Sequence, residues 1–599
     1  MKRKLGMAVG LVLLLHPSSF ILHLSAGAEP VVDSPMYRDP QLPTPRPVPI
    51  FPGRLLPLWL EALERPEKDL KCRAALSIAE AKRRGMKGLQ AAVSALVREL
   101  ERPDQDRTVR ASMARALVSL DARESAPALA QAAAGGEPDV RDLIEPALAR
   151  WDYKPMRAEW LKRLDQPPFR RSAILAIQGL AAVREEKVAP RLRQLVLANE
   201  TPLGVRLEAA RALGIIQTAG LEEESHKLAA DTSARGKIDR LIAASLLRQH
   251  KSDEAVRQLQ NLGRDTEPAT AATALARLLE IDPSLVLPLL EPTLSNPDAK
   301  VRGFGVEVLH RLPSDAHIRL LGDRLSDLHP DVRNQARVAL LDLDGKTEWR
   351  DVVRREAMRV LNGDEWQGLE QAALLLGQVD HKAAAPRLLV MLNGKRGEAI
   401  VAAAWALRKL AIPETLPDVL RYVEGQYDKM NEDDTTGGRS ALSPEAVDDQ
   451  LAQLVQFLGK SKYRPADGLL RQWVPPGQPR NRVGYEARAA AAWALGLIHE
   501  GTEIPEIATM LARRVAADKP TDVEDTRVRW MSAITLGRMK AKAGLPTLRE
   551  YYVEKKPSLF PFNNACGWAI EQITGEKMPP AGTVELMQLG WFLYPIGGD

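Results

Sequence analysis

Apolar residues recur along most of the chain with the spacing of an amphipathic helix. In the stretch 205–216, for example, Val205, Ala209, Ala212 and Leu213 fall on one helical face, and charged residues lie between them. The alternating patterns and β-branched runs that are typical of strands are scarce. The pattern therefore predicts an all-α protein.

The helical stretches also repeat along the sequence. A Val-Arg pair followed by alanine- and leucine-rich sequence opens six of them: Val109-Arg110, Val140-Arg141, Val205-Arg206, Val301-Arg302, Val332-Arg333 and Val528-Arg529. The first two pairs are 31 residues apart, and so are the fourth and fifth. This interval indicates one structural unit repeated many times rather than several unrelated domains.

A proline begins the second apolar stretch of many units, at Pro127, Pro190, Pro288, Pro386, Pro417 and Pro546. Proline suits the first turn of a helix, because an N–H group there has no partner within the helix. Each unit is therefore predicted to be a pair of antiparallel helices. One pair cannot bury its apolar face alone, so we expect the pairs to stack into an α-α superhelix, a solenoid with a continuous core.

Glycines stand near the ends of several first helices, at Gly214, Gly377, Gly496 and Gly537. Glycine is the residue that most easily ends a helix in the left-handed conformation. We therefore interpret these glycines as helix terminators.

The order of Val-Arg, Ala-Leu-Gly and Ala-Pro-Xaa-Leu resembles HEAT repeats, in particular the short bacterial type first recognised in phycobiliprotein lyases. The resemblance covers roughly residues 55–575, although the units near 234–265 and 345–375 lack a clean Val-Arg opening. It implies a HEAT/armadillo-like solenoid with a concave surface on which another macromolecule docks. It does not specify a function, because such solenoids serve many.

The amino terminus has the layout of a secretory signal peptide. Basic residues 2–4 precede an apolar run over 5–15, and Ala26-Gly27-Ala28 is a suitable cleavage site. We therefore expect export to the periplasm or cell envelope of a bacterium. An uncleaved membrane anchor is the alternative, because apolar residues around 20–24 lengthen the run. After cleavage no membrane span is expected.

Proline is concentrated in the next stretch, with nine prolines from Pro30 to Pro57. Proline at this density disfavours helix and favours an extended, semi-rigid spacer. The sequence therefore divides into a signal peptide (1–28), a proline-rich linker (29–57), a repeat array (58–424), an acidic and glycine-containing loop insertion (425–448), a continued array (449–575) and a C-terminal capping tail (576–599). The tail could instead be a docking peptide for a partner.

The charge of the chain changes little of this picture. There are 83 basic and 78 acidic residues, a net charge of +5, but residues 1–28 hold three basic and no acidic side chains. Cleavage would leave 80 basic and 78 acidic residues, a net charge of +2. Basic and acidic residues are interspersed, which is typical of solvated helix faces and not of a nucleic-acid-binding stripe.

No catalytic or metal-binding motif is present in the sequence. The nine histidines include no HExxH pair, and Cys72 and Cys566 belong to no CxxC motif. The two cysteines stand among apolar helical residues and are interpreted as core thiols. We therefore expect no cofactor, no metal and no enzymatic activity.

Two tryptophans share nearly the same context. Trp405 and Trp493 both stand in Ala-Ala-Trp-Ala-Leu, and Trp530 and Trp568 occupy similar places in later units. Repetition at one position favours packing between neighbouring repeats. A ladder of aromatic residues that binds a partner is the alternative.

Two loops, 425–443 and 473–484, interrupt the array and provide candidate contacts with a partner. Trp473 stands in the proline-containing second loop, where no periodic pattern buries it, so we expect it to be exposed. The candidate partner-binding residues are Trp473, Arg480, Arg482, Asp433 and Asp434.

These features favour a non-enzymatic protein–protein interaction scaffold of the bacterial envelope. Its partner, an unidentified protein, would bind the concave surface or the loops. Two alternatives stay open: a bilin-lyase-like or other cofactor-handling HEAT protein, and a HEAT-like protein that binds nucleic acid. The predicted export disfavours both, the scarcity of catalytic residues disfavours the first, and the nearly neutral mature chain disfavours the second.

Overall fold

The computed structural model describes residues 32–134, 138–166, 169–233, 236–431, 442–475, 482–519, 522–553, 561–577, 579, 583–588 and 592–594. These residues form thirty α-helices and four short strands, which confirms the all-α prediction. They separate into two compact units. The first unit holds Pro49–Thr293 and the described residues from Leu586 onward; the second holds Leu294–Glu585 and the described part of Glu29–Val48. The predicted signal peptide lies outside the described residues.

The helices of the first unit are α1 (Leu55–Glu64), α2 (Lys68–Arg83), α3 (Val93–Leu100), α4 (Arg107–Leu120), α5 (Ala126–Ala134), α6 (Pro138–Arg150), α7 (Pro155–Asp165), α8 (Arg170–Ala182), α9 (Ala189–Leu197), α10 (Leu203–Ile216), α11 (Glu222–Ala229), α12 (Lys237–Leu246), α13 (Asp253–Leu262), α14 (Pro268–Ile281) and α15 (Leu290–Leu294).

The helices of the second unit are α16 (Ala299–Arg311), α17 (Asp315–Arg324), α18 (Pro330–Asp344), α19 (Arg350–Leu361), α20 (Trp366–Gln378), α21 (Ala385–Met391), α22 (Gly397–Leu410), α23 (Leu416–Asn431), α24 (Pro444–Lys460), α25 (Asp467–Trp473), α26 (Tyr485–Ile498), α27 (Pro505–Val515), α28 (Thr526–Arg538), α29 (Leu545–Tyr551) and α30 (Pro561–Thr574). The strands β2 (Asp518–Lys519) and β3 (Asp522–Val523) form an antiparallel hairpin, and β1 (Arg46–Ile50) pairs with β4 (Thr583–Met587).

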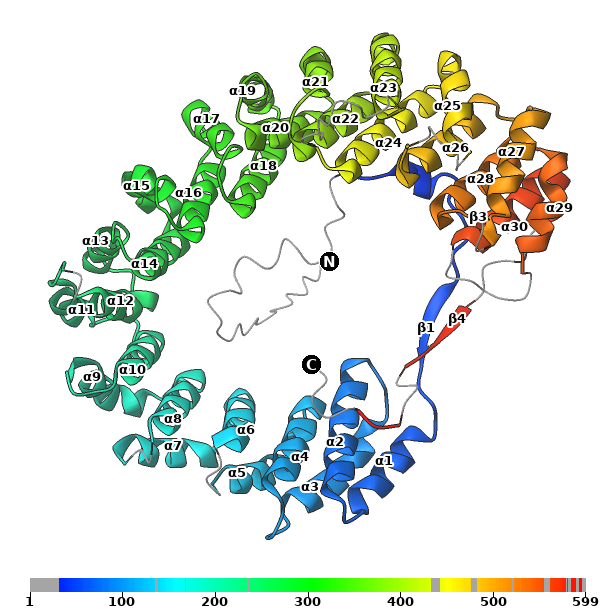
Figure 1. The fold of residues 1–599 in the computed structure, drawn as a ribbon. Coiled ribbons are helices and arrows are strands. Elements are labelled where there is room, and N and C mark those ends of the chain that lie inside the picture. The colour runs from blue at the N-terminus through cyan, green and yellow to red at the C-terminus, as the bar shows by residue number, and fades with distance from the viewer. Residues whose placement is uncertain are drawn as a thin grey trace, which may run out of the picture. The chain divides into compact units, whose positions relative to one another are not determined.

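Within each unit the helices alternate between two rows. The even-numbered helices pack side by side in an inner row, and each also packs on an odd-numbered helix of the outer row (Figure 1). This arrangement is the α-α solenoid of stacked, HEAT-like helix pairs that the repeat pattern predicted. The stretches 234–265 and 345–375, which lack the usual opening, contribute ordinary members of both rows.

In three units, the arginine of the Val-Arg opening ties an inner helix to the outer helix before it. Arg206 Nε donates to the Val196 carbonyl at 3.0 Å, and Arg529 Nε donates to the Val515 carbonyl at 3.0 Å. Both carbonyls belong to the last turn of an outer helix, where backbone acceptors have no partner within the helix. A guanidinium there also complements the negative end of the helix dipole. The repeated arginine is therefore a structural clamp.

The prolines begin outer helices as predicted, with one exception. Pro127, Pro190 and Pro386, for instance, each stand in the first turn of an outer helix. Pro288 lies instead within a 3-10 turn, Pro283–Leu289, that precedes α15. The prediction is therefore wrong for Pro288.

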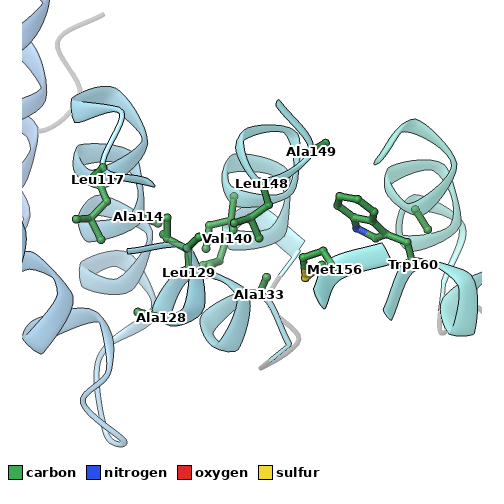
Figure 2. Close-up of a cluster of buried hydrophobic side chains, with 14 of the residues drawn as sticks. Ala114, Leu117, Ala128, Leu129, Ala133, Val140, Leu148, Ala149, Met156 and Trp160 are labelled. Atoms are coloured by element: carbon green, nitrogen blue, oxygen red, sulfur yellow. The ribbon is translucent and has the colours of Figure 1, made fainter. Parts of the chain in front are cut away.

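Small and aliphatic side chains fill the space between the rows. Ala114 and Leu117 of α4 meet Leu129 of α5 and Val140 and Leu148 of α6, and all five are fully buried (Figure 2). Burial of each larger aliphatic side chain stabilises the fold by about 1.5–3 kcal/mol. The low content of aromatic residues follows from this close packing of small side chains.

The glycines near the ends of inner helices permit close contact between helices and do not terminate them. A Cβ on Gly377 would lie 2.6 Å from a ring carbon of Trp405, and one on Gly537 would lie 2.7 Å from the Cα of Ala569. The left-handed residue comes later, at Asp380 after α20 and at Lys540 after α28. The interpretation of these glycines as terminators is wrong, because the next inner helix occupies the place of their side chain.

Several domain boundaries also differ from the predicted ones. Helix α23 continues to Asn431 and α24 begins at Pro444, so much of the predicted insertion 425–448 is helical. The ring of Tyr427 packs on Trp473 at 5.8 Å between centroids, and this contact supports the longer helix. Residues 432–441 lie outside the described residues.

Described residues of both terminal extensions, the predicted spacer and the predicted cap, contact helices or strands of the fold. In the linker 29–57, residues 33–39 contact inner helices of the second unit, and α1 already begins at Leu55. In the tail 576–599, β4 pairs with β1, and residues 592–594 contact α1 and α2 rather than the last helix pair. Proline disfavours α-helix before Leu55, but it does not prevent docking on a folded surface.

We expect the glycine contacts to be visible in thermal unfolding. In Gly459→Ala the new Cβ would lie 2.6 Å from the Cβ and 2.7 Å from the Cα of Ala494, so α24 and α26 must separate. A loss of about 1–3 kcal/mol is expected, measured as a lower Tm by circular dichroism. Gly425→Ala is the matched control, because nothing lies within 4 Å of its Cβ in α23. Its Tm should stay or rise, since alanine favours helix by up to about 1 kcal/mol. Equal shifts in both variants would contradict the assignment.

Candidate protein-binding surface

The inner row of the second unit holds a short segment of the chain itself. Residues 33–39, which we call the N-terminal segment, lie along α22, α24, α26 and α28 (Figure 1). The segment contains one 3-10 turn, Pro35–Arg38. It is bound almost entirely by side chains of these four helices.

Successive inner helices use one equivalent position to bind this segment. Trp405 of α22 donates from Nε1 to Asp33 Oδ1 at 2.9 Å, and Trp493 of α26 donates from Nε1 to the Asp39 carbonyl at 2.8 Å. Between them, Gln456 of α24 stands three residues before Gly459, as Trp493 stands three residues before Gly496. Its Oε1 accepts from the Met36 N–H at 3.2 Å. The segment thus advances three residues from one inner helix to the next.

Many of these bonds go to the main chain of the segment. The Asp33 carbonyl accepts from Arg408 Nη2 at 2.9 Å and from Gln453 Nε2 at 3.1 Å. Arg408 Nε in turn donates to Gln453 Oε1 at 2.6 Å, which holds the two side chains in place. Bonds to main-chain groups hold a peptide whatever its side chains are. The surface therefore recognises backbone as well as sequence.

Aspartates at both ends of the segment pair with buried arginines. Asp33 Oδ1 accepts from Arg408 Nη2 at 2.6 Å, and Asp39 Oδ1 lies 2.7 Å from Arg538 Nη2. The two arginine side chains are 8% and 7% exposed, whereas the aspartate side chains are 33% and 37% exposed. Burial alone raises the pKa of Asp33, but hydrogen bonds from Trp405 and Arg408 outweigh it, and the pKa lies below its usual value. Asp33 is therefore ionised in its site.

Met36 and Tyr37 fill the middle of the surface. Met36 is 1% exposed, and the ring of Tyr37 stacks on Trp530 at 5.1 Å between centroids. The Tyr37 hydroxyl donates to Glu486 Oε2 at 2.6 Å. Burial, and then the hydrogen bond to the Glu486 carboxylate, raises the pKa of Tyr37 far above its usual range. Tyr37 stays a neutral donor at any physiological pH.

The buried carboxyl group of Asp448 holds two helices of this surface, α24 and α26, together. Asp448 of α24 accepts from the N–H groups of Glu486 at 3.0 Å and Ala487 at 2.9 Å, and so caps the start of α26. Burial is the main cause that raises the pKa of Asp448 to about 6, and the negative charges of Glu486 and Asp449 add to it. Asp448 thereby fixes the end of α26 that carries Glu486, the partner of Tyr37.

The first unit holds a second terminal segment. Trp59 of α1 donates from Nε1 to the Phe592 carbonyl at 2.6 Å, and the Tyr594 N–H donates to Ser77 Oγ of α2 at 2.6 Å. Leu593 packs against the apolar core of this unit. Each unit therefore holds one terminal segment of the chain through side-chain to main-chain bonds.

Of the loop residues chosen from the sequence, the structure describes Trp473 and Arg482, and neither is among the residues that bind the N-terminal segment through the bonds given above. Trp473 is fully buried as the last residue of α25, against Tyr427, so the prediction that it is exposed is wrong. Trp473 completes the apolar face of the short outer helix α25. The prolines that follow it in the sequence suggested a loop instead of the end of a helix. Arg482 is exposed. Arg480, Asp433 and Asp434 lie outside the described residues.

The packing interpretation of the repeated tryptophans is confirmed for Trp405 and Trp493. The rings of Trp405 and Trp493 are buried between neighbouring inner helices, while their N–H groups bind the N-terminal segment. Trp568 occupies the equivalent place, since its ring faces Gly537. Trp530 does not; Ile534, three residues before Gly537, stands there instead. The shared position of Gln456 was the sequence signal for this surface that we missed.

The described residues contain no group of three or more His, Cys, Asp or Glu side chains that could hold a metal ion. Among them, no helix combines the length and the apolar character that crossing a membrane requires. Cys72 and Cys566 are both free and buried, as predicted.

No family model matches the sequence, and no curated protein matches it. Among solved structures, yeast importin-beta (Kap95p) is 15% identical with a TM-score of 0.44, over 86% of this chain and 72% of that chain. A structure of Kap95p with RanGDP is 14% identical with a TM-score of 0.48 over the same shares. Kap121p bound to Pho4p is 12% identical with a TM-score of 0.45, over 83% of this chain and 54% of that chain. With every TM-score below 0.5, these similarities identify neither a family nor a partner.

The raised pKa of Asp448 predicts a pH-dependent stability. Its folded value of about 6 lies above the ordinary value of about 3.9, so the folded state binds more protons between pH 4 and 6. The free energy of unfolding therefore falls as pH rises through this window, by on the order of 2–3 kcal/mol. In Asp448→Asn this contribution is absent, and the stability of the variant relative to the parent should increase from pH 4 to 7 in denaturant titrations.

Asp448→Ala is the control for the Asp448→Asn experiment. It should lose the same pH dependence and also about 1 kcal/mol at every pH, because neither N–H at the start of α26 keeps its acceptor. An Asn variant that follows the pH profile of the parent would contradict the raised pKa.

Proposed function

We propose that this protein is a non-enzymatic scaffold that binds segments of other proteins along its inner helix rows. The observation that carries this proposal is the binding of residues 33–39 by α22, α24, α26 and α28. Trp405, Gln456 and Trp493 stand at one equivalent position of successive inner helices. They bind Asp33, Met36 and Asp39 in turn, so that each helix binds the segment three residues beyond the helix before it. A repeating surface that binds a chain in this way suits peptide recognition.

The polar side chains of this surface are arranged for binding. Gln453 and Gln456 present both a donor and an acceptor, and both groups of each side chain are in use. Buried amide side chains that are fully hydrogen-bonded hold one orientation. The bond from Arg408 to Gln453 lies within the surface and orients both side chains before a peptide binds, which lowers the entropic cost of binding.

The scaffold is proposed to act in the bacterial envelope. Residues 2–4 are basic, the run over 5–15 is apolar, and Ala26-Gly27-Ala28 suits a signal peptidase. Cleavage after Ala28 would make Asp33 the fifth residue of the mature chain. The N-terminal segment would then begin almost at the new amino terminus.

Cross-linking mass spectrometry on the tagged full chain, purified from envelope extract, tests the scaffold. We expect one protein to co-purify in stoichiometric amount, with its cross-links on even-numbered helices. Arg421→Glu on the outer helix α23 is a matched surface control and should leave recovery unchanged, since its side chain is 75% exposed. Cross-links confined to odd-numbered helices, or no stoichiometric partner, would contradict the proposal.

The same purified protein tests export. We expect its amino terminus to be Glu29 by mass spectrometry, and its fractionation to follow periplasmic or envelope proteins. An amino terminus at Met1 together with recovery from the cytoplasm would exclude export.

A further inference from the structure

We propose that α22, α24, α26 and α28 form a binding site for a short acidic segment of a partner protein, and that residues 33–39 occupy this site until the partner displaces them. The inference rests on the proposed scaffold function and names the class of partner. The N-terminal segment is then an internal ligand, whose chemistry shows what the site accepts.

The two ends of the site select negative charge. Arg408 and Arg538 are each more than nine-tenths buried, and each pairs with an aspartate of the segment. A buried guanidinium that loses its carboxylate is strongly destabilised. The site therefore requires acidic side chains six residues apart, as Asp33 and Asp39 are.

The middle of the site selects an apolar residue followed by an aromatic one. Met36 is buried against the inner row, and Tyr37 stacks on Trp530 while its hydroxyl reaches Glu486. Arg527 Nη1 donates to the other carboxylate oxygen of Glu486 at 2.5 Å and so fixes the orientation of this carboxylate. The preferred pattern is Asp-x-x-Met-Tyr-x-Asp, and Ser34 within it accepts from Gln456 Nε2 at 2.9 Å.

The remaining contacts would serve any segment of this pattern. The Asp33 carbonyl, the Met36 N–H and the Asp39 carbonyl are bound by Gln453, Gln456 and Trp493. These are main-chain groups, which a partner segment in the same conformation also presents. Nothing in these bonds depends on the segment belonging to this chain.

The internal segment leaves part of the site unused. Within the part of the chain that the structure describes, Arg538 Nη1 and Trp530 Nε1 are buried donors without a hydrogen-bond partner. Asp39 engages one terminal nitrogen of Arg538, whereas a bidentate carboxylate engages two and binds more strongly. A partner segment that also supplies these acceptors would bind better than the internal one, and this difference allows displacement.

The internal segment competes with a partner segment for the site and so weakens the apparent affinity of the partner. A ligand on the same chain binds intramolecularly, at an effective concentration that the connecting chain sets. A free peptide of the same sequence therefore binds the parent poorly and binds much better once the internal segment is expelled.

The test uses the full chain with Asp33→Lys and Asp39→Lys, which places positive charge against Arg408 and Arg538 and expels the segment. The probe is a fluorescent synthetic peptide of residues 31–42, VVDSPMYRDPQL, followed by anisotropy. We expect its Kd for this variant to be at least tenfold lower than for the parent. A matched peptide with asparagine at both aspartate positions should bind at least tenfold more weakly than the probe.

A second measurement leaves both aspartates of the N-terminal segment in place. Gln41 is exposed, and Cys72 and Cys566 are buried, so Gln41→Cys accepts a dye close to Trp493 and Trp530. An excess of unlabelled peptide should displace the segment and relieve quenching of the dye, while the asparagine peptide should not. This readout does not depend on the folding of the double lysine variant.

The outcomes separate the two proposals. No saturable peptide binding by a folded double lysine variant, together with no change in dye fluorescence at millimolar peptide, overturns the displaceable segment. Partner cross-links on inner helices would still stand in that case and would support the scaffold alone. If the parent chain sediments as a dimer that exchanges its N-terminal segments, the proposal that residues 33–39 occupy the site of their own chain is also overturned.

Discussion

The close approach of neighbouring inner helices is the constraint on which the structure of each unit depends. One helix pair cannot bury its apolar face, so the pairs must stack, and stacking requires glycine or alanine where two inner helices meet. Gly459 facing Ala494 and Gly537 facing Ala569 show how little room remains. Larger side chains are confined to positions beside these contacts, and the outer helices are held to the row by arginines of the repeat openings.

The same packing produces the recognition surface. Neighbouring inner helices pack through equivalent close contacts, so the residue beside each contact occupies an equivalent position on the next helix. Trp405, Gln456 and Trp493 are these residues. A tryptophan there serves two purposes, since its ring fills the gap between helices while its N–H remains at the surface. Binding and stability therefore depend on the same positions. Asp448 contributes to both, because it caps the start of α26 and so positions Glu486, the partner of Tyr37.

Prediction from sequence succeeded where a physical requirement repeats with the period of the helix. The helix pairs, their starting prolines and the packing of Trp405, Trp493 and Trp568 all follow from such repetition. It failed where one residue type has two uses. Glycine ends helices and also lets them touch, and Gly537 does the second. Trp473 next to prolines suggested an exposed loop, but its helix extends far enough to bury it.

The sequence by itself determined the class of fold, the repeating helix pair and the composition of the core, because these depend on local propensity and periodic burial. Only the tertiary structure decided that residues 33–39 are bound, and by which helices. The reason is that Asp33 and Arg408 are 375 residues apart, and no local pattern encodes a contact over that separation. The segment has the composition of a spacer, and only the surface built by distant helices makes it a ligand.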